Sequence, residues 1–239
     1  MTRELILTID TSSRAGSVAV SRGETVLGEI LLNGGANHTD RLLLSLQQLL
    51  QGLQLELEQF DAFAVVRGPG SFTGLRVGVA TVKGLAMATG KPVIPLSSLQ
   101  LLACQAPLAR DPVCALLDAR KQEVYSALYR WEGGRPVPLG PERVLPPEQV
   151  LESLPPEVVL VGDGCQTYRT LIVRRLGSRA RFLPWTCHPP RASGGAALAL
   201  AALRADETVV AAALVPTYIR PSEAEINWLR QQQAPGQVG

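Results

Sequence analysis

The sequence has few of the residues that most often carry enzyme chemistry. Only two histidines, His38 and His188, occur in 239 residues, and the four cysteines show no C-x-x-C spacing. Four thiols in a chain of this length are expected to pack as small apolar residues rather than to form a zinc site or a disulfide framework. Two histidines far apart in sequence, without a carboxylate cluster, do not indicate a metal site either. We therefore expect no metal and no cofactor.

Lysine and long hydrophobic runs are also scarce. The chain has three lysines against twenty arginines, and its net charge is only +2. The arginines are scattered, so nothing indicates a protein that coats nucleic acid, and any RNA contact is expected to be weak or indirect. Asp10 interrupts the first apolar run, and no window is long enough to span a bilayer. We expect a soluble cytoplasmic protein with no membrane partner.

What the chain does have is an unusual glycine-rich stretch at residues 67–78, Arg-Gly-Pro-Gly-Ser-Phe-Thr-Gly-Leu-Arg-Val-Gly. It follows an apolar strand candidate at 62–66. Its Pro-Gly pair favours a tight turn, Ser71 is a good helix N-cap, and Gly90 is a good stop signal. The pattern predicts strand, turn and helix. The first helical amides would then point into the loop, where an anion or a partner's acceptor could bind.

The predicted helix at 72–88 is apolar or small-sided almost all round. One stripe consists of Leu75, Val79, Val82 and Ala86, and the other side carries Thr73, Val77, Ala80, Thr81, Gly84 and Ala88. Such a helix is normally buried on two faces. One face can cover its own sheet, while the other needs either a partner protein or a second layer of the same domain. Small residues would let another helix approach closely: Gly74, Gly78, Ala80 and Gly84.

The chain opens with three predicted antiparallel strands, at 4–10, 17–21 and 25–31. The first loop contains Asp10, Thr11, Ser12 and Ser13. Hydroxyls and a carboxylate at a strand end could face a nucleotide phosphate or a metal. Purely local Asx and Ser/Thr turns give the same composition, and the residues do not decide between these interpretations.

A second amphipathic helix is predicted from His38, with Asn37 as its N-cap and Asp40 completing a box-like cap. Its apolar face is expected to contain Leu42, Leu43, Leu46, Leu49, Leu50 and Leu53, whereas Leu44 points nearly opposite.

The second half of the chain repeats the order of the first. After a linker at 107–112, strands are predicted at 113–117 and 123–130, followed by a helix at 148–154, a strand at 158–161, and helices at 166–175 and 191–205. Both halves begin with consecutive strands and then alternate helix and strand, which predicts a duplicated α/β unit. We therefore expect an N-terminal lobe at 1–106, a C-terminal lobe at 107–225 and a flexible tail at 226–239.

No catalytic motif is complete. The glycines at 68, 70 and 74 exceed a dinucleotide fingerprint by one residue, and no acidic residue ends the next strand. A phosphate-binding Gly-Lys-Ser/Thr is missing. Ser71 lacks the Gly-x-Ser-x-Gly context of a hydrolase, and its general base would have to be His38 or His188.

Five sequence segments together resemble the bacterial TsaB family, also called YeaZ. They are Ile-Asp-Thr-Ser-Ser at 9–13 with 17–20, His-Thr-Asp-Arg-Leu at 38–42, the glycine motif at 68–78, Leu-Asp-Ala-Arg at 117–120 with Glu-Val-Tyr at 123–125, and Pro-Thr-Tyr-Ile-Arg at 216–220. The resemblance covers residues 4–220.

The resemblance implies an α/β, two-lobed, actin-like and Hsp70-like ATPase (ASKHA) fold with a duplicated βββαβα-type unit. It also implies a non-catalytic scaffold subunit, required with TsaD and the ATPase TsaE for threonylcarbamoyl transfer to adenosine 37 of tRNA. TsaD-like sequences carry a His-x-x-x-His metal pair where this chain has Pro-Leu-Ser-Ser-Leu-Gln at 95–100. Pairing with TsaD, and homodimer formation in its absence, are implied to use the helices of the first lobe.

The expected interface residues are His38, Arg41, Leu42, Ser71, Phe72, Thr73, Arg76, Val77, Ala80, Thr81 and Gly84. Asp10, Thr11, Ser12 and Ser13 are expected to bind a nucleotide weakly at most. Two alternatives stay open: a glycoprotease-like peptidase that would use Ser71 and His38, and a stand-alone nucleotide-binding regulator that would use the loop at Asp10.

Overall fold

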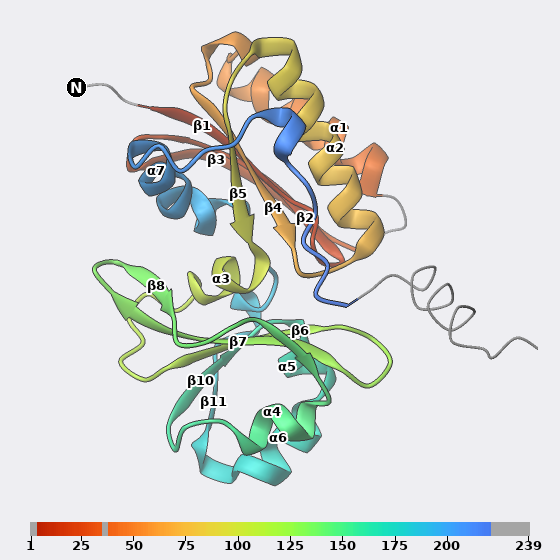
Figure 1. Cartoon of the computed structure of the whole chain (residues 1–239), viewed down its shortest axis with the longest axis vertical. Helices are drawn as coiled ribbons and strands as arrows, with labels where there is room; N and C mark the ends of the chain where they lie inside the picture. Colours follow the sequence, from red (N-terminus) through yellow and green to blue (C-terminus); the bar gives the residue numbers. More distant parts are fainter. Residues whose placement is uncertain (1–3, 35–37, 221–239) are drawn as a thin grey trace, which may run out of the picture.

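The computed structural model describes residues 4–34 and 38–220, which form two lobes, each built on its own sheet (Figure 1). The first sheet has the strand order β3-β2-β1-β4-β5. Its strands are β1 (Leu5–Asp10), β2 (Ala15–Arg22), β3 (Thr25–Asn33), β4 (Ala62–Gly68) and β5 (Val93–Ser97). The first three strands pair antiparallel, and β1, β4 and β5 pair parallel. The predicted opening of three antiparallel strands is confirmed.

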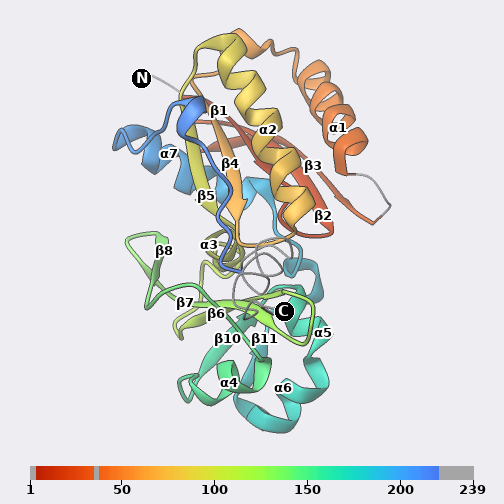
Figure 2. The ribbon, with the colours of Figure 1, turned by 45° about the vertical axis from the view of Figure 1, so that its right-hand side comes forward.

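Helices cover both faces of the first sheet. On one face lie α1 (His38–Leu53) and α2 (Phe72–Thr89), and on the other lies α7 (Ala196–Arg204) (Figures 1 and 2). Strand β1 shows why: Leu7 and Ile9 join the core under α1 and α2, while Ile6 joins the core under α7. Side chains alternate along a strand, so an apolar residue at nearly every position requires a cover on each side.

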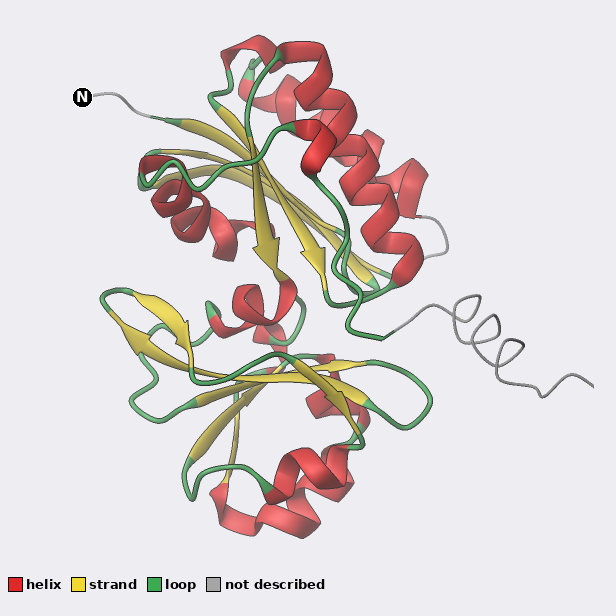
Figure 3. Ribbon diagram, viewed as in Figure 1, coloured by secondary structure: helices red, strands yellow, loops and turns green. Residues whose placement is uncertain are grey.

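The second sheet has the order β11-β10-β6-β7-β8, with β9 paired to β7 (Figure 3). Its strands are β6 (Val113–Asp118), β7 (Val124–Glu132), β8 (Arg135–Pro138), β9 (Arg143–Leu145), β10 (Val158–Val161) and β11 (Ala180–Phe182). One face packs against α4 (Pro147–Glu152) and α6 (Arg169–Leu176), near the short α5 (Asp163–Thr167). The other face is covered by α3 (Ser98–Ala103), which lies between the lobes. Short 3-10 turns complete the chain: Leu57–Gln59, Gly177–Arg179, Trp185–Cys187, Ala192–Gly195 and Ala211–Ala213.

The lobe boundaries expected at 107–225 differ from the observed packing. Leu198 and Leu200 of α7 lie in the core of the first sheet, and Val209 pairs with Val93 of β5. Leu214 lies in the core under α1 and α2. The chain therefore returns to the first lobe after the second is built. The predicted cap at Asn37 and the tail at 226–239 lie outside the described residues.

The predicted strand–turn–helix at 62–90 is confirmed. The hydroxyl oxygen of Ser71 accepts a hydrogen bond from Gly74 N, and Gly90 ends α2 in the left-handed conformation. The first loop locks this helix start in place. Ser71 N donates to Ser12 O at 2.7 Å, and Thr11 Oγ1 donates to Gly74 O at 2.7 Å.

The glycines of α2 serve two different purposes. A Cβ on Gly74 would lie 2.0 Å from Thr11 O, and one on Gly78 would lie 2.4 Å from Thr11 Oγ1. The expectation that these two glycines admit a partner's helix is therefore wrong, because the chain's own loop occupies that space. Around Gly84 a Cβ would meet nothing within 4 Å.

We predict opposite effects for Gly74→Ala and Gly84→Ala. The first should lower the free energy of unfolding by about 1–3 kcal/mol, because the new methyl group collides with backbone that cannot move freely. The second should leave it unchanged or raise it by about 0.5–1 kcal/mol, because alanine is the better helix former at an open position. Urea unfolding of both variants measures the difference, and equal midpoints would contradict the packing described.

Candidate functional site

The first loop is a buried polar cluster at the end of β1. Asp10, Thr11, Ser12 and Ser13 all lie below the surface, covered by the start of α2. Asp10 Oδ1 accepts a hydrogen bond from Ser12 N at 2.9 Å, and Ser13 Oγ accepts one from Ala15 N at 3.1 Å. These are the local turns that the composition allowed, in which one oxygen of the Asp10 carboxylate and the Ser13 hydroxyl serve the loop's own backbone.

Two side-chain oxygens of this cluster, Asp10 Oδ2 and Ser12 Oγ, are buried and have no hydrogen-bond partner among the described residues. Burial raises the pKa of Asp10 from 3.8 to about 6, and the interactions of its carboxylate with Ser12 offset only part of this effect. Near pH 7 the folded chain therefore holds a carboxylate in a site that favours the protonated acid.

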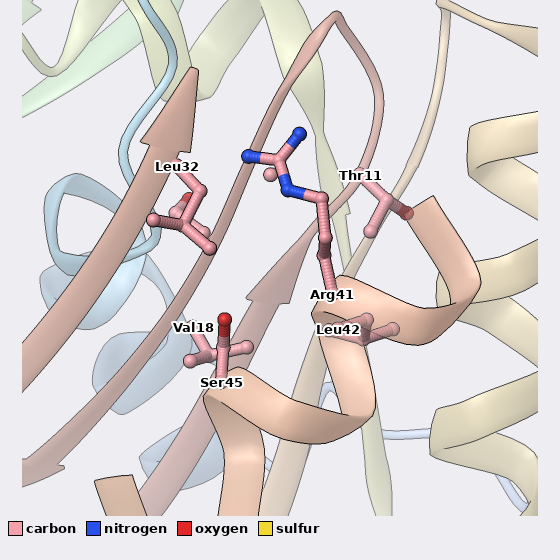
Figure 4. A pocket seen from close by; sticks show the side chains of 8 residues that line it. Thr11, Val18, Leu32, Arg41, Leu42 and Ser45 are labelled. Carbon is pink, nitrogen blue, oxygen red and sulfur yellow. The ribbon is translucent and has the colours of Figure 1, made fainter. Parts of the chain in front are cut away.

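A small pocket adjoins the loop, between α1 and the strands β2 and β3 (Figure 4). Arg41, Leu42 and Ser45 project into it from α1, and Thr11 lines it from the loop side. Its volume is about 10 Å³, which is room for about one water molecule. As the described residues shape it, this pocket is far too small for a nucleotide.

Among the described side chains, the structure does not bring Ser71 and His188 of the peptidase alternative together. Ser71 caps α2 in the first lobe, and its oxygen already accepts from Gly74 N at 3.3 Å. His188 is buried in the second lobe, where its Nδ1 accepts from Gly162 N at 3.1 Å. Burial also lowers the pKa of His188. His38 begins α1, but its side chain is outside the described part.

The outer face of α2 carries most of the predicted interface residues. We define the outer face of α2 as its solvent-exposed residues and the two half-buried residues that lie between them. They are Phe72, Thr73, Arg76, Val77, Ala80, Thr81, Gly84, Met87 and Ala88. Ser71 is exposed just before the helix. This face is small-sided and apolar in its middle, and its N-terminal end carries an aromatic ring and an arginine.

Helix α1 lies beside α2 on the same side of the sheet, and here the predicted residues need correction (Figures 1 and 2). Leu42 is only 5% exposed and packs in the core, so it offers no contact surface to a partner. Leu43, expected on the buried face, is 54% exposed, and Leu44 is 52% exposed as predicted. The helix turns its 42-46-49 stripe inward, which leaves 43 and 44 outside. Arg41 is half-buried and donates to Gly34 O.

Several exposed residues on or beside these helices were not among the predicted contacts. Met87 is 74% exposed, and its spacing of three from Gly84 was a signal in the sequence. The position of Leu43 in the helical repeat was also a signal, but the broad leucine stripe led to its assignment to the buried face. Tyr218 stacks on Phe72, and no local pattern places a residue so distant in sequence there.

Two further findings concern the described residues only. Among residues 4–34 and 38–220, no group of three or more His, Cys, Asp or Glu side chains is arranged to hold a metal ion. Within the same ranges, no helix combines the length and the apolar composition that crossing a membrane requires.

We predict that Asp10→Asn stabilises the chain in a pH-dependent way. The folded-state pKa near 6 lies above the ordinary value of 3.8, so the carboxylate costs stability that grows as pH rises through this interval. At pH 8 the variant should have the larger free energy of unfolding, by up to about 3 kcal/mol, and at pH 4 the difference should nearly vanish. Urea unfolding at both values tests this. The same exchange at exposed Asp206 should have little effect at either pH, and a pH-independent difference for Asp10→Asn would contradict the buried charge.

Comparison with known proteins agrees with this architecture. A family model described as TsaD, tRNA N6-adenosine threonylcarbamoyltransferase, matches residues 26–228. The TsaB protein of Bacillus subtilis, described as a tRNA threonylcarbamoyladenosine biosynthesis protein, is 30% identical over 95% of this chain and 99% of its own length. Its counterpart in Escherichia coli K12 is 37% identical over 70% of this chain and 74% of its own length.

Solved structures give the same result. YeaZ from Pseudomonas aeruginosa superposes with a TM-score of 0.78 at 34% identity, covering 90% of this chain and 99% of that one. The ethanolamine utilization protein EutJ from Carboxydothermus hydrogenoformans, at 10% identity and a TM-score of 0.51, covers 81% of this chain and 89% of its own and shares the fold alone. The predicted two-lobed, actin-like fold is confirmed, and the chain belongs to the TsaB (YeaZ) family.

Proposed function

We propose that this chain acts in forming threonylcarbamoyladenosine at position 37 of tRNA, as a non-catalytic subunit that pairs with a TsaD-type transferase. The relatives' names support the pathway. The single observation that carries the subunit role is the outer face of α2. It presents Ala80, Gly84 and Met87 to solvent beside the exposed leucines of α1. An uncovered apolar helix pair of this kind is typical of a protein–protein interface.

The chemistry of the described residues supports a non-catalytic role. Burial raises the pKa values of Cys104 and Cys114 to about 12, so neither thiol supplies a nucleophilic thiolate at neutral pH. Where TsaD-like sequences carry their metal pair, this chain has Ser97, which caps α3 by accepting from Gln100 N at 3.2 Å. Among the side chains that the structure describes, no pairing of a nucleophile with a base supports the peptidase alternative.

The wider assembly follows from the same proposal. The TsaD-type partner would cover the outer face of α2, and in its absence a second copy of this chain would use the same surface. The ATPase TsaE would join through the complex rather than through this chain alone. Contact with tRNA would be indirect or weak, and the site of action would be the cytoplasm. A stand-alone nucleotide regulator is less well supported, because Asp10 and its neighbours are buried.

We predict that Ala80→Glu abolishes binding to the TsaD-type paralogue from the same organism. A carboxylate at the centre of the covered face would be buried without a partner, which costs about 3 kcal/mol or more and weakens binding at least about 100-fold. Ala201→Glu is the matched control, because Ala201 is an exposed alanine of α7 on the opposite face of the sheet. It should bind like the unaltered chain.

Co-purification of the two tagged proteins measures the interaction, and the modified nucleoside content of tRNA measures the function. Cells that rely on this chain should lose threonylcarbamoyladenosine with Ala80→Glu and keep it with Ala201→Glu. Full retention of the complex with Ala80→Glu would refute the assignment of the interface.

A further inference from the structure

The C-terminal part of the described chain forms a strap between the two lobes. We define the strap as residues 214–220, which run beside α2 and then cross to the second lobe (Figures 1 and 2). Lys83 Nζ donates to Leu214 O at 3.1 Å, and Thr217 N donates to Arg67 O at 2.7 Å. Arg220 reaches the second lobe, where it donates to Ala119 O at 2.8 Å and pairs with Glu123. Both ends of the strap are therefore held by hydrogen bonds.

Between these anchors, the strap adds one side chain to the outer face of α2. The Tyr218 ring stacks on Phe72, with 4.9 Å between centroids and a tilt of 30°. Arg76 also lies over the Phe72 ring, its Cζ 3.9 Å from the ring centroid, and its Nε donates to Tyr218 Oη at 3.2 Å. We call Phe72, Arg76 and Tyr218 the arginine cluster.

The arginine cluster holds an exposed guanidinium in one orientation without neutralising it. Within the described residues Arg76 forms no ion pair, whereas Arg220 of the strap pairs with Glu123. Its Nε is used by Tyr218, so the two terminal amino groups remain to bind a ligand. A planar fork fixed by stacking and by one hydrogen bond is pre-organised for a carboxylate, which it can bind through two parallel hydrogen bonds.

We propose that the arginine cluster is the receptor for an acidic side chain of the protein that covers α2, and that Tyr218 is its positioning residue. This inference rests on the proposed function, since it takes the TsaD-type subunit as the occupant. Arg76 lies one helical turn before Ala80, so the cluster continues the apolar outer face. A partner helix seated on Ala80 and Gly84 brings its own side chains to Arg76. The two rings flank that contact with apolar surface, which suits an Asp or Glu at the rim of an apolar interface.

A free phosphate would use the guanidinium but would gain nothing from the adjoining apolar face. The geometry therefore favours a protein carboxylate. A purely internal role, in which the cluster only fastens the strap, is separated from recognition by measuring stability and affinity on the same variants.

The test uses the full chain, the TsaD-type paralogue and calorimetry at two salt concentrations. Arg76→Gln should weaken binding about 10–100-fold, the range for a lost charge-assisted hydrogen-bonded pair. Arg76→Lys should recover only part of this loss, since it keeps the charge but not the fork. Tyr218→Phe keeps the stacked ring and removes only the hydroxyl, and it should weaken binding about 3–10-fold. The salt dependence of binding should flatten in Arg76→Gln.

Arg174→Gln is the matched control, because Arg174 is an exposed arginine on α6 of the second lobe. It should bind like the unaltered chain. Thermal unfolding of every variant reports any structural effect separately. If Arg76→Gln and Tyr218→Phe bind like Arg174→Gln while Ala80→Glu does not bind, this inference is overturned and the proposed interface stands. If the unaltered chain does not bind the paralogue, both fall. Normal affinity with a lowered unfolding temperature would show that the cluster only fastens the strap.

Discussion

The contact of the first loop with the start of α2 determines what this protein can present to others. Thr11 approaches Gly74 with its backbone oxygen and Gly78 with its side-chain hydroxyl, so closely that neither glycine could carry a side chain. A hydrogen bond from Ser71 N to Ser12 O closes the same contact from the other side. Because the loop fills the space beneath the glycine turn, the chain itself binds the Ser71 amide and the Thr11 hydroxyl of this region. Helix α2 is left with only its outer side for an interaction.

The same contact explains the state of Asp10. An acid at the end of β1 is sealed beneath α2. One of its carboxylate oxygens accepts from Ser12 N, and the other has no partner within residues 4–34 and 38–220. Water that would normally solvate the charge is excluded, and the raised pKa records that cost. The buried carboxylate of Asp10 lies where the loop packs tightly against α2. This indicates that packing against α2, rather than solvation of the acid, determines the conformation of the loop. The small pocket beside it is consistent with this, since α1 and the strands close around the loop as well.

Local signals in the sequence predicted the elements around the site well, and long-range contacts were the part they missed. Ser71 and Gly90 mark the ends of α2 because capping depends on residues within a few positions. Gly74 and Gly84 cannot be distinguished from the sequence pattern. In the structure, Gly74 contacts a loop residue 63 positions away, whereas Gly84 faces solvent. Leu42 and Leu43 differ only in helical phase, which one broad leucine stripe does not determine. Residues 196–204 are apolar enough for either sheet, so their return to the first lobe could not be inferred from composition.

The strap brings together two of the sequence segments that resemble the family. The segment at 117–125 contains a turn in which Arg120, Lys121 and Gln122 all have positive φ, a costly conformation for residues with side chains. The segment at 216–220 supplies Arg220, which binds Ala119 O on one side of that turn and Glu123 on the other. The two segments are therefore the halves of one contact. Since Tyr218, two residues earlier, touches α2, the strained turn of the second lobe and the outer face of the first are joined by a few residues. A protein that covers α2 thus meets a surface whose shape depends on both lobes.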